Sequence, residues 1–432
     1  MLAVPADSVL AASSKTIPFH TFLWKIASRC NLNCSYCYVY NLADSEWRRQ
    51  PPFMDLATAR QAAVRMREHL VVHNKTSASI IFHGGEPLLA GRDGIEALLD
   101  TIGDAFRGSG IELSFGIQTN LLLFDVPIAE LLRDRNVALG VSIDGPPAVN
   151  DALRVDRAGR GSSRELEEKL ALLTSQRYRP IFSGFLSVIQ PRSDAAAVID
   201  YLASFRPPSM DFLLPLDNHD RLPPGMSAAC GPSPYGRWLL RAFEHWLTLR
   251  PPIVVRTFNT IVALLCGAPS QVEHLGLTPV DLVVIETNGE IEGVDSLKGA
   301  FPGATQLGLN VFSHDFDQAA VHTEVLKRQH GRQDLCNTCR SCDVVEVCGA
   351  GYLPHRFSTA RKFDNPSVYC ADLYALIHRI REALIAELQS TSVQSAVRRV
   401  IGFSRQRIFN LGRHDRRPRT NRPACAEHPG RA

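Results

Sequence analysis

Apolar runs alternate with amphipathic segments along the first half of the chain. The short runs predict six buried strands, at residues 21–26, 78–83, 111–119, 138–143, 180–189 and 210–216. The segments between them predict helices at residues 56–69, 94–105, 127–135, 163–175 and 195–204. Asp55 and Asp93 are the expected N-caps of the first two helices, because a carboxylate there accepts hydrogen bonds from free backbone N–H groups. Such units predict an α/β fold, a partial (β/α)6 TIM-like barrel whose ligands gather at the C-terminal ends of the strands.

A different pattern follows the barrel. Residues 217–236 are rich in Pro and Gly and predict a linker, after which helices are expected at 236–249 and 254–266. Two short runs, 281–286 and 290–292, flank the turn Asn288-Gly289 and predict a β-hairpin in a small α+β domain. A last helix is expected at about 373–388. The expected division is an N-terminal extension (1–17), the barrel (18–216), a linker with bridging helices (217–275), the α+β domain (276–377), and a helix end with a basic tail (378–432).

Composition narrows the classes of function. The 432 residues carry a net charge of only +3 and are 45% hydrophobic, which predicts a globular protein and no nucleic-acid partner. Residues 1–16 lack the basic and apolar regions of a secretory signal, and no stretch is long enough to span a membrane, so a cytoplasmic protein is expected. Eleven cysteines in a reducing compartment favour metal sites over disulfides. The arginine-rich tail from residue 397 predicts a solvated extension, with docking of an acidic peptide or nucleic acid as the alternative.

Three of the cysteines, Cys30, Cys34 and Cys37, lie within eight residues directly after the first predicted strand. Thiolates on so short a loop converge on one centre, and a cubane iron–sulfur cluster takes one cysteine per iron, which leaves one iron open to bind and activate a molecule. Zinc or free thiols are the alternatives, but zinc needs a fourth ligand and the nearby His20 lies upstream of the strand. With Tyr36 before the last cysteine, this C-x3-C-x2-C spacing resembles the radical S-adenosylmethionine (SAM) superfamily. The resemblance implies a [4Fe-4S] cluster that binds SAM.

Polar residues that follow the next predicted strands match the same family. Gly84 and Gly85 allow the backbone to come close to a ligand, and Glu86 supplies an acceptor. The cofactor-binding residues that the resemblance implies are Tyr36, Gly84, Gly85, Glu86, Pro87, Gln118, Ser142, Asp144 and Arg154. Residues 84–87 would hold the amino group of SAM, and Arg154 would meet its carboxylate. The alternatives are that Ser142 and Asp144 cap the following segment and that Arg154 pairs on the surface.

A second group of cysteines lies near the C-terminus. Its members are Cys336, Cys339, Cys342, Cys348 and Cys370. A zinc ribbon is one interpretation of their spacing. The region also resembles a SPASM domain, the auxiliary iron–sulfur domain of peptide-modifying radical SAM enzymes, and this resemblance implies that the last four hold an auxiliary [4Fe-4S] cluster. Val294 and Tyr352 stand where an inner cluster would need cysteines, so one auxiliary cluster is expected. Cys336 either replaces one ligand or is a free thiol.

Asp295 is the candidate catalytic residue. It follows Val294 after the predicted hairpin, and the aspartate at the matching position of sulfatase-maturating relatives is a proposed general base. A hairpin cap is the alternative.

Four distal stretches, 294–298, 307–312, 348–356 and 363–370, resemble the FxsB-type maturases that build cyclophanes in ribosomally made peptides. This resemblance implies hydrogen abstraction by a 5′-deoxyadenosyl radical and a carbon–carbon crosslink in a precursor peptide. The implied partners are that peptide and a reductant such as flavodoxin or ferredoxin. The alternatives are a sulfatase-type formylglycine maturase, a thioether-forming maturase, or a non-catalytic iron–sulfur or zinc regulator.

Overall fold

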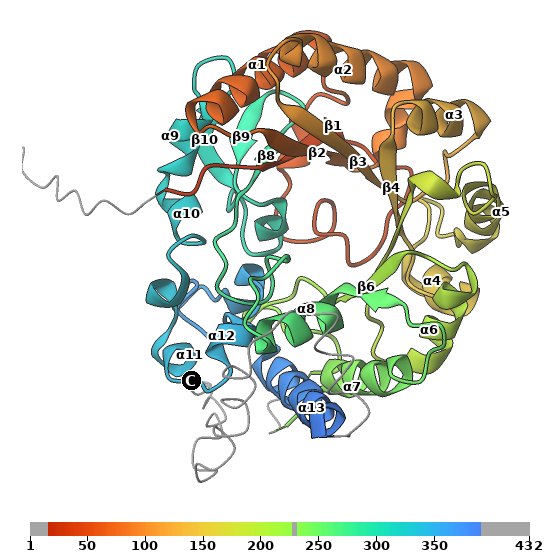
Figure 1. The fold of residues 1–432 in the computed structure, drawn as a ribbon, viewed down its shortest axis with the longest axis vertical. Coiled ribbons are helices and arrows are strands. Elements are labelled where there is room, and N and C mark those ends of the chain that lie inside the picture. The colour runs from red at the N-terminus through yellow and green to blue at the C-terminus, as the bar shows by residue number, and fades with distance from the viewer. Residues whose placement is uncertain (1–15, 227–230, 390–432) are drawn as a thin grey trace, which may run out of the picture.

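A curved sheet of ten strands forms the centre of the computed structural model, which describes residues 16–226 and 231–389 (Figure 1). The strands are β1 (Thr21–Ala27), β2 (Ser77–Gly84), β3 (Glu112–Thr119), β4 (Val137–Ser142), β5 (Phe182–Val188), β6 (Ser209–Leu213), β7 (Val254–Val255), β8 (Leu282–Ile285), β9 (Glu290–Glu292) and β10 (Gln306–Asn310). Their order is β10-β9-β8-β1-β2-β3-β4-β5-β6-β7, and the neighbours from β8 to β7 are parallel. Among the described strands, the two end strands do not pair with each other, so the expected partial, open barrel is confirmed.

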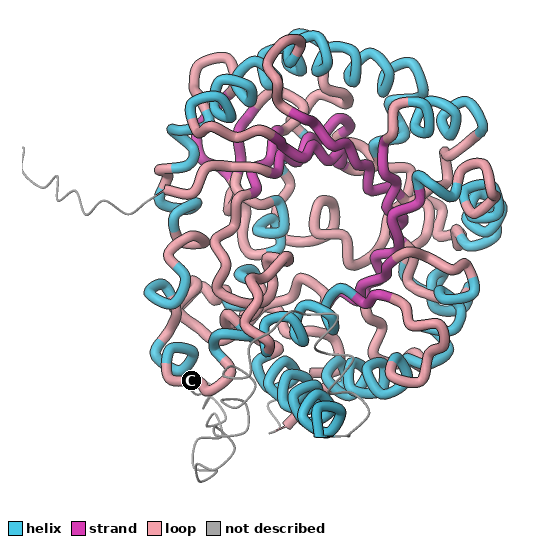
Figure 2. The backbone as a smooth tube through the Cα atoms, viewed as in Figure 1, coloured by secondary structure: helices cyan, strands magenta, loops and turns pink. Residues whose placement is uncertain are grey.

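Helices cover the outside of this arc, and the strands lie inside it (Figure 2). The α-helices are α1 (Leu56–Val72), α2 (Gly91–Phe106), α3 (Val126–Asp134), α4 (Pro147–Leu153), α5 (Ser163–Leu173), α6 (Ala195–Ser204), α7 (Pro234–Trp246), α8 (Arg256–Leu265), α9 (Phe316–Ala320), α10 (Thr323–Leu326), α11 (Asn337–Arg340), α12 (Val345–Cys348) and α13 (Cys370–Gln389). The 3-10 helices are η1 (Glu46–Arg48), η2 (Pro87–Ala90), η3 (Arg179–Ile181), η4 (Asp295–Gly299), η5 (Gly331–Asp334) and η6 (Leu353–Arg356).

All six predicted barrel strands are confirmed, with ends that differ by at most three residues. The apolar runs predict them well because a parallel strand covered on both faces buries nearly every side chain, as β1 does. Asp55 caps α1 by accepting from the backbone N–H of Thr58, as expected. The expectation for Asp93 is wrong, because α2 already begins at Gly91 and Asp93 lies within its first turn.

The C-terminal hairpin joins the barrel sheet. It forms as expected, with β8 and β9 antiparallel around the turn at Gly289. β8 then pairs in parallel with β1, and Thr21 lies opposite Leu282. The sheet therefore runs across the boundary expected at residue 276, and the division into domains stays a prediction.

α13 ties the end of the described chain to the barrel. It packs against α7 and α8, and Asp372 accepts hydrogen bonds from the backbone N–H and the hydroxyl of Ser233, the N-cap of α7. The N-terminal extension before residue 16 and the basic tail lie outside the described residues. None of the described helices is sufficiently long and apolar to cross a membrane.

Candidate active site

The candidate residues gather at one edge of the sheet, where the parallel strands end. The cysteine loop follows β1, the Gly-Gly-Glu-Pro segment ends β2, and Gln118 and Ser142 lie at the ends of β3 and β4. This is the edge at which ligands bind in parallel α/β folds.

The three thiols after β1 lie near one another. The pKa of Cys30 is raised to about 12, first by burial, then by the charge of Glu86, and to a smaller extent by the neighbouring Cys34 and Cys37. Burial also raises the pKa values of Cys34 and Cys37. Such thiols stay protonated unless positive charge is bound beside them, and metal ions supply that charge.

The spacing of these sulfur atoms does not suit a single ion. Among the described His, Cys, Asp and Glu side chains, the one group whose ligand atoms all lie within 4.8 Å of one another is His69, His73 and Asp317. Thiolates on one zinc ion would lie about 3.8 Å apart, since each Zn–S bond is about 2.3 Å. The loop therefore fits a larger group, such as an iron–sulfur cluster, better than it fits zinc.

His69, His73 and Asp317 are close enough together for a single ion, but they form hydrogen bonds between helices instead. Nε2 of His69 accepts from the backbone N–H of Phe19 at 3.0 Å, so its proton lies on Nδ1 and is donated to Asp317 at 2.6 Å. His73 contacts the same carboxylate oxygen at 2.7 Å. These hydrogen bonds join α1 to α9 and leave no space for an ion between the nitrogen and oxygen atoms.

Gly84 and Gly85 bring the end of β2 against the cysteine loop. A Cβ atom on Gly84, whose φ is +143°, would lie 1.9 Å from the carbonyl oxygen of Ala27, and one on Gly85 would lie 2.3 Å from that of Arg29. The close approach that glycine permits here is thus to the protein backbone as well as to any ligand.

Glu86 is buried, and its carboxylate is used within the protein. It accepts from the hydroxyl of Thr119 at 2.6 Å and from the backbone N–H groups of Asn120 at 2.8 Å and Leu88 at 2.9 Å. Burial raises its pKa, and these three donors act in the opposite direction. Glu86 therefore holds the ends of β2 and β3 together by hydrogen bonds. Pro87, the next residue, is the first residue of η2.

Tyr36, Asp144 and Arg154 form a buried chain beside the cysteine loop. The hydroxyl of Tyr36 donates to Asp144 at 2.7 Å and accepts from Nη1 of Arg154 at 2.8 Å. Asp144 does not cap α4, and Arg154 is not on the surface, since it is only 6% exposed. Among the described residues, no acceptor pairs with Nε of Arg154. A buried guanidinium with a spare donor fits the carboxylate that the SAM resemblance places there.

Gln118 and Ser142 are joined across the neighbouring strands β3 and β4. The side-chain amide of Gln118 donates to the Ser142 hydroxyl at 2.8 Å. Ser142 therefore lies at the strand end as expected, with its side chain directed to β3.

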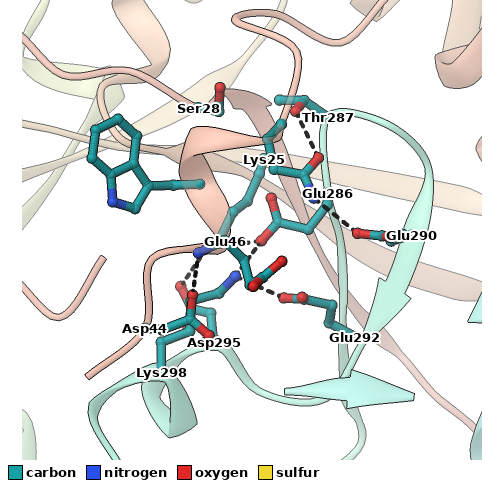
Figure 3. Close-up of polar contacts among 12 residues, drawn as sticks. Lys25, Ser28, Asp44, Glu46, Glu286, Thr287, Glu290, Glu292, Asp295 and Lys298 are labelled. Atoms are coloured by element: carbon teal, nitrogen blue, oxygen red, sulfur yellow. Dashed lines mark hydrogen bonds and ion pairs between the residues drawn. The ribbon is translucent and has the colours of Figure 1, made fainter. Parts of the chain in front are cut away.

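Asp295 is buried at the start of η4 among charged groups from several elements (Figure 3). Its Oδ2 accepts from the Tyr38 hydroxyl at 2.5 Å and lies 3.6 Å from Nζ of Lys25 and 3.9 Å from Nδ1 of His83. Burial by itself would raise its pKa, but Lys25, His83 and Tyr38 outweigh burial and hold the pKa of Asp295 below its ordinary value. The side chain caps no helix, so the interpretation of Asp295 as a cap is wrong.

Lys25 also contacts a second set of buried charged residues. Its ammonium lies 3.3 Å from Glu286, which accepts from Lys298 at 2.8 Å, and Lys298 lies 3.0 Å from Glu292. Figure 3 shows these side chains converging from β1, the end of β8, β9 and η4.

The C-terminal cysteines gather where α11, α12 and α13 meet. Cys339 packs against Cys336, and a hydrogen bond with Cys339 lowers the pKa of the Cys336 thiol to about 6. The pKa of Cys348 is raised to about 12 and that of Cys370 to about 11, in both cases mainly by burial and in part by the neighbouring Cys342. All five thiols therefore belong to one group, and the same spacing argument disfavours a single zinc ion.

Tyr352 lies at one of the positions where an inner cluster would need a cysteine. Its hydroxyl donates to Glu273, and its ring packs edge-on against His274 and His355. Val294, at the other such position, is buried in an apolar cluster with Leu297. Ordinary protein packing thus fills this region.

Sequence reasoning missed the partners of Asp295. Lys25, Tyr38 and His83 lie within or beside the predicted strands and the cysteine loop, and Lys298 follows the hairpin. The one signal in the sequence is Lys25, a charged residue inside a run that is otherwise buried and apolar.

The comparisons with known proteins define the class. Residues 24–200 match the model of the radical SAM superfamily, so these residues form a radical SAM domain, the catalytic domain of an enzyme. Domains of this class use a [4Fe-4S] cluster and SAM.

Particular relatives extend the similarity beyond that domain. The chain is 27% identical to an uncharacterized protein of Methanocaldococcus jannaschii, over 73% of this chain and 96% of the other. It is 24% identical to the serine-type anaerobic sulfatase-maturating enzyme of Klebsiella aerogenes, over 80% of this chain and 82% of that enzyme.

Solved structures share the fold. The structure of anSMEcpe with bound AdoMet and the Kp18Cys peptide superimposes with a TM-score of 0.71 at 20% identity, covering 85% of this chain and 98% of the other. Streptococcus suis SuiB bound to the precursor peptide SuiA gives a TM-score of 0.53 at 14% identity, covering 82% of this chain and 76% of SuiB.

Proposed function

We propose that this radical SAM enzyme modifies a ribosomally made precursor peptide by forming a carbon–carbon cyclophane crosslink. The observation that carries the proposal is Asp295, a buried carboxylate held in its ionised form at the strand edge that carries the cysteine loop. The peptides named with anSMEcpe and SuiB support a peptide substrate for this fold.

The proposed cofactor site is built from the residues at the strand ends. Cys30, Cys34 and Cys37 would hold the [4Fe-4S] cluster, and Arg154 would donate its spare Nε–H to the carboxylate of SAM. The carboxylate of Glu86 already accepts three hydrogen bonds, so the backbone of residues 84–87 is the proposed acceptor for the SAM amino group. When bound, cluster and SAM supply one-electron chemistry that removes a hydrogen atom from a C–H bond.

The crosslink itself sets the role of the remaining residues. After a side-chain carbon bonds to an aromatic ring, the ring regains aromaticity only when it loses one electron and one proton. Asp295 would take the proton, because it is ionised and accepts hydrogen bonds at its Oδ2. Cys339, Cys342, Cys348 and Cys370 would hold the one auxiliary [4Fe-4S] cluster to which the electron passes. A reductant such as flavodoxin or ferredoxin would supply the first electron.

Anaerobic reconstitution followed by incubation with SAM and dithionite tests the radical chemistry, with 5′-deoxyadenosine as the measured product. Co-expression with short peptides encoded beside the gene then tests the substrate, and mass spectrometry of the expected crosslink shows a loss of two hydrogens at an aromatic residue. Absence of 5′-deoxyadenosine would contradict the whole proposal.

A second candidate function is oxidation of Ser or Cys to formylglycine, which the names of the sulfatase-maturating relatives favour. Oxidation of Ser also removes two hydrogens, so mass alone does not separate the two products. Formylglycine reacts with a hydrazide probe and the cyclophane does not, and fragmentation stops inside a crosslinked ring. A hydrazide-reactive product would replace the crosslink as the assigned activity.

A further inference from the structure

Five charged side chains form a continuous buried network, the charge network, made of Lys25, Glu286, Glu292, Asp295 and Lys298. None of the five is more than 8% exposed. The network holds three carboxyl groups and two ammonium groups, so full ionisation would leave one negative charge in excess. An uncompensated buried charge costs several kcal/mol, and a carboxyl group avoids that cost by keeping a proton.

The contacts indicate which carboxyl group keeps the proton. Glu286 contacts two ammonium groups, those of Lys25 at 3.3 Å and Lys298 at 2.8 Å. Glu292 contacts one ammonium group, that of Lys298 at 3.0 Å from its Oε2, and its other neighbour is the carboxyl group of Glu286.

Asp295 differs from Glu292 in the number of groups that face it. Tyr38 donates to it at 2.5 Å, and Lys25 and His83 lie within 3.9 Å. Glu292 is thus the least compensated carboxyl group of the three.

We propose that Glu292 stores a proton and releases it when Asp295 takes one from the substrate. The inference rests on the proposed function, in which Asp295 is the proton acceptor. Protonation of Asp295 removes one negative charge from the network, and loss of the proton from Glu292 restores it. A proton then moves along the contacts Asp295–Lys25–Glu286–Lys298–Glu292. Each lysine donates one proton and accepts another, so its charge does not change. At the end Asp295 is ionised again and Glu292 is protonated again. The balance is one proton taken from the substrate by Asp295 and one proton given up by Glu292 to water.

The surroundings of Glu292 agree with this role. Burial has the largest effect and the charge of Glu286 adds to it, so that the pKa of Glu292 rises to about 7 despite Lys298 and Lys25. Titratable groups outside the network also face it. His83 of β2 and Tyr38 of the segment after β1 contact Asp295. Glu290 of β9, and Asp44 and Glu46 of the segment after β1, lie nearby (Figure 3).

The first test is infrared spectroscopy of the full chain with its clusters reconstituted, and it needs no substrate. Glu292→Gln keeps the size and neutrality of the protonated side chain, so it should fold and lose one protonated-carboxyl band that titrates near neutral pH in the wild type. Glu290→Gln, two residues away on β9, is the matched control and should keep that band. A Glu292→Gln spectrum identical to the wild type would overturn the proposal.

The second test examines the coupling. Asp295→Asn imitates the protonated form of Asp295, so the Glu292 band should titrate about one pH unit lower, as expected for removal of a nearby charge at an effective dielectric constant of about 20. An unshifted titration would overturn the exchange of protons, because a merely structural Glu292 would not respond in this way.

A third measurement tests whether the charge network contributes to turnover. With the co-expressed precursor peptide, Glu292→Gln should lower the yield of crosslink per 5′-deoxyadenosine about tenfold or more, whereas Glu290→Gln should not change it. An unchanged yield contradicts the proton store. If the wild type forms no 5′-deoxyadenosine, the proposed function fails instead, and the infrared result still decides where the proton lies.

Discussion

The ionised state of Asp295 depends on a few side chains that meet it from different elements. Burial favours the neutral carboxyl, while the ammonium of Lys25, the Tyr38 hydroxyl and His83 favour the carboxylate and prevail. A buried carboxylate beside a cation remains ready to accept a proton across the neutral pH range. At this scale, the electrostatic surroundings matter more than the residue type.

Replacing Asp295 with Ala should separate radical formation from product formation. The Asp295→Ala variant is expected to make 5′-deoxyadenosine at nearly the wild-type rate, because the cysteine loop is untouched. Its yield of crosslinked peptide should fall about 100-fold or more, the range in which general acid–base groups contribute. Liquid chromatography with mass spectrometry measures both products.

The Asp295→Asn variant controls for the space that Ala opens, since it keeps the size of the side chain and should show the same loss. Full crosslinking by the Ala variant would show that Asp295 is not the proton acceptor.

At the scale of elements, the end of β2 and the cysteine loop depend on each other. Gly85→Ala would place a Cβ atom 2.3 Å from the carbonyl oxygen of Arg29, so one of the two segments must move. We expect the variant to lose the loop cluster and retain about four iron atoms per chain, those of the auxiliary cluster. Iron analysis after reconstitution measures this loss.

Gly103→Ala is the matched control, because a Cβ atom at Gly103 of α2 meets no atom within 4 Å. This variant should bind as much iron as the wild type. Equal iron in the Gly85 variant would show that the contact between the two segments is not needed for the cluster.

α1 offers a pH-dependent prediction. The backbone N–H of Thr58 holds the pKa of Asp55 in the folded protein below its ordinary value. The ionised cap therefore stabilises α1 fully at pH values above the pKa of Asp55 in the unfolded chain, about 4. This stabilisation is lost as the pH falls through the pKa of Asp55 in the folded protein. Asp55→Ala should destabilise the first turn by about 1 kcal/mol at pH 7, which corresponds to about fivefold faster amide exchange, and should have little effect below pH 3. Hydrogen exchange measured by mass spectrometry provides the comparison.

Asn is a good N-cap without a charge, so Asp55→Asn should keep most of the stability at both pH values. A loss in Asp55→Ala that is equally large at low pH would contradict the assignment to the ionised cap.

At the scale of the whole molecule, the expected number of iron–sulfur clusters depends on which side chains fill the space between the barrel and the C-terminal region. Tyr352 and Val294 occupy the positions of the missing cysteines, and both are packed against other side chains. We expect about eight iron atoms per reconstituted chain, four in each of two clusters. Iron analysis combined with Mössbauer spectroscopy distinguishes this from about four or about twelve, either of which would contradict one auxiliary cluster.

Variants of the ligands assign those irons. Replacing Cys342 and Cys348 together should leave about four, and Cys336→Ala should leave about eight if the other four cysteines hold the auxiliary cluster. Loss of iron in Cys336→Ala would make this thiol a ligand.

The sequence by itself determined the barrel strands, most of their helices and the cysteine loop. Each of these depends on residues close in the chain: an apolar run, a helical period, or three thiols within eight residues. The parallel pairing of β8 with β1 and the surroundings of Asp295 were decided only by the tertiary structure. Tyr38 and Asp295 are 257 residues apart in the chain, and no local pattern records which distant side chains a folded sheet brings together. The charge network exists because the fold brings Lys25 of β1 into contact with charged side chains from the end of β8, from β9 and from η4. These side chains are buried, so each charge is stabilised mainly by its charged neighbours.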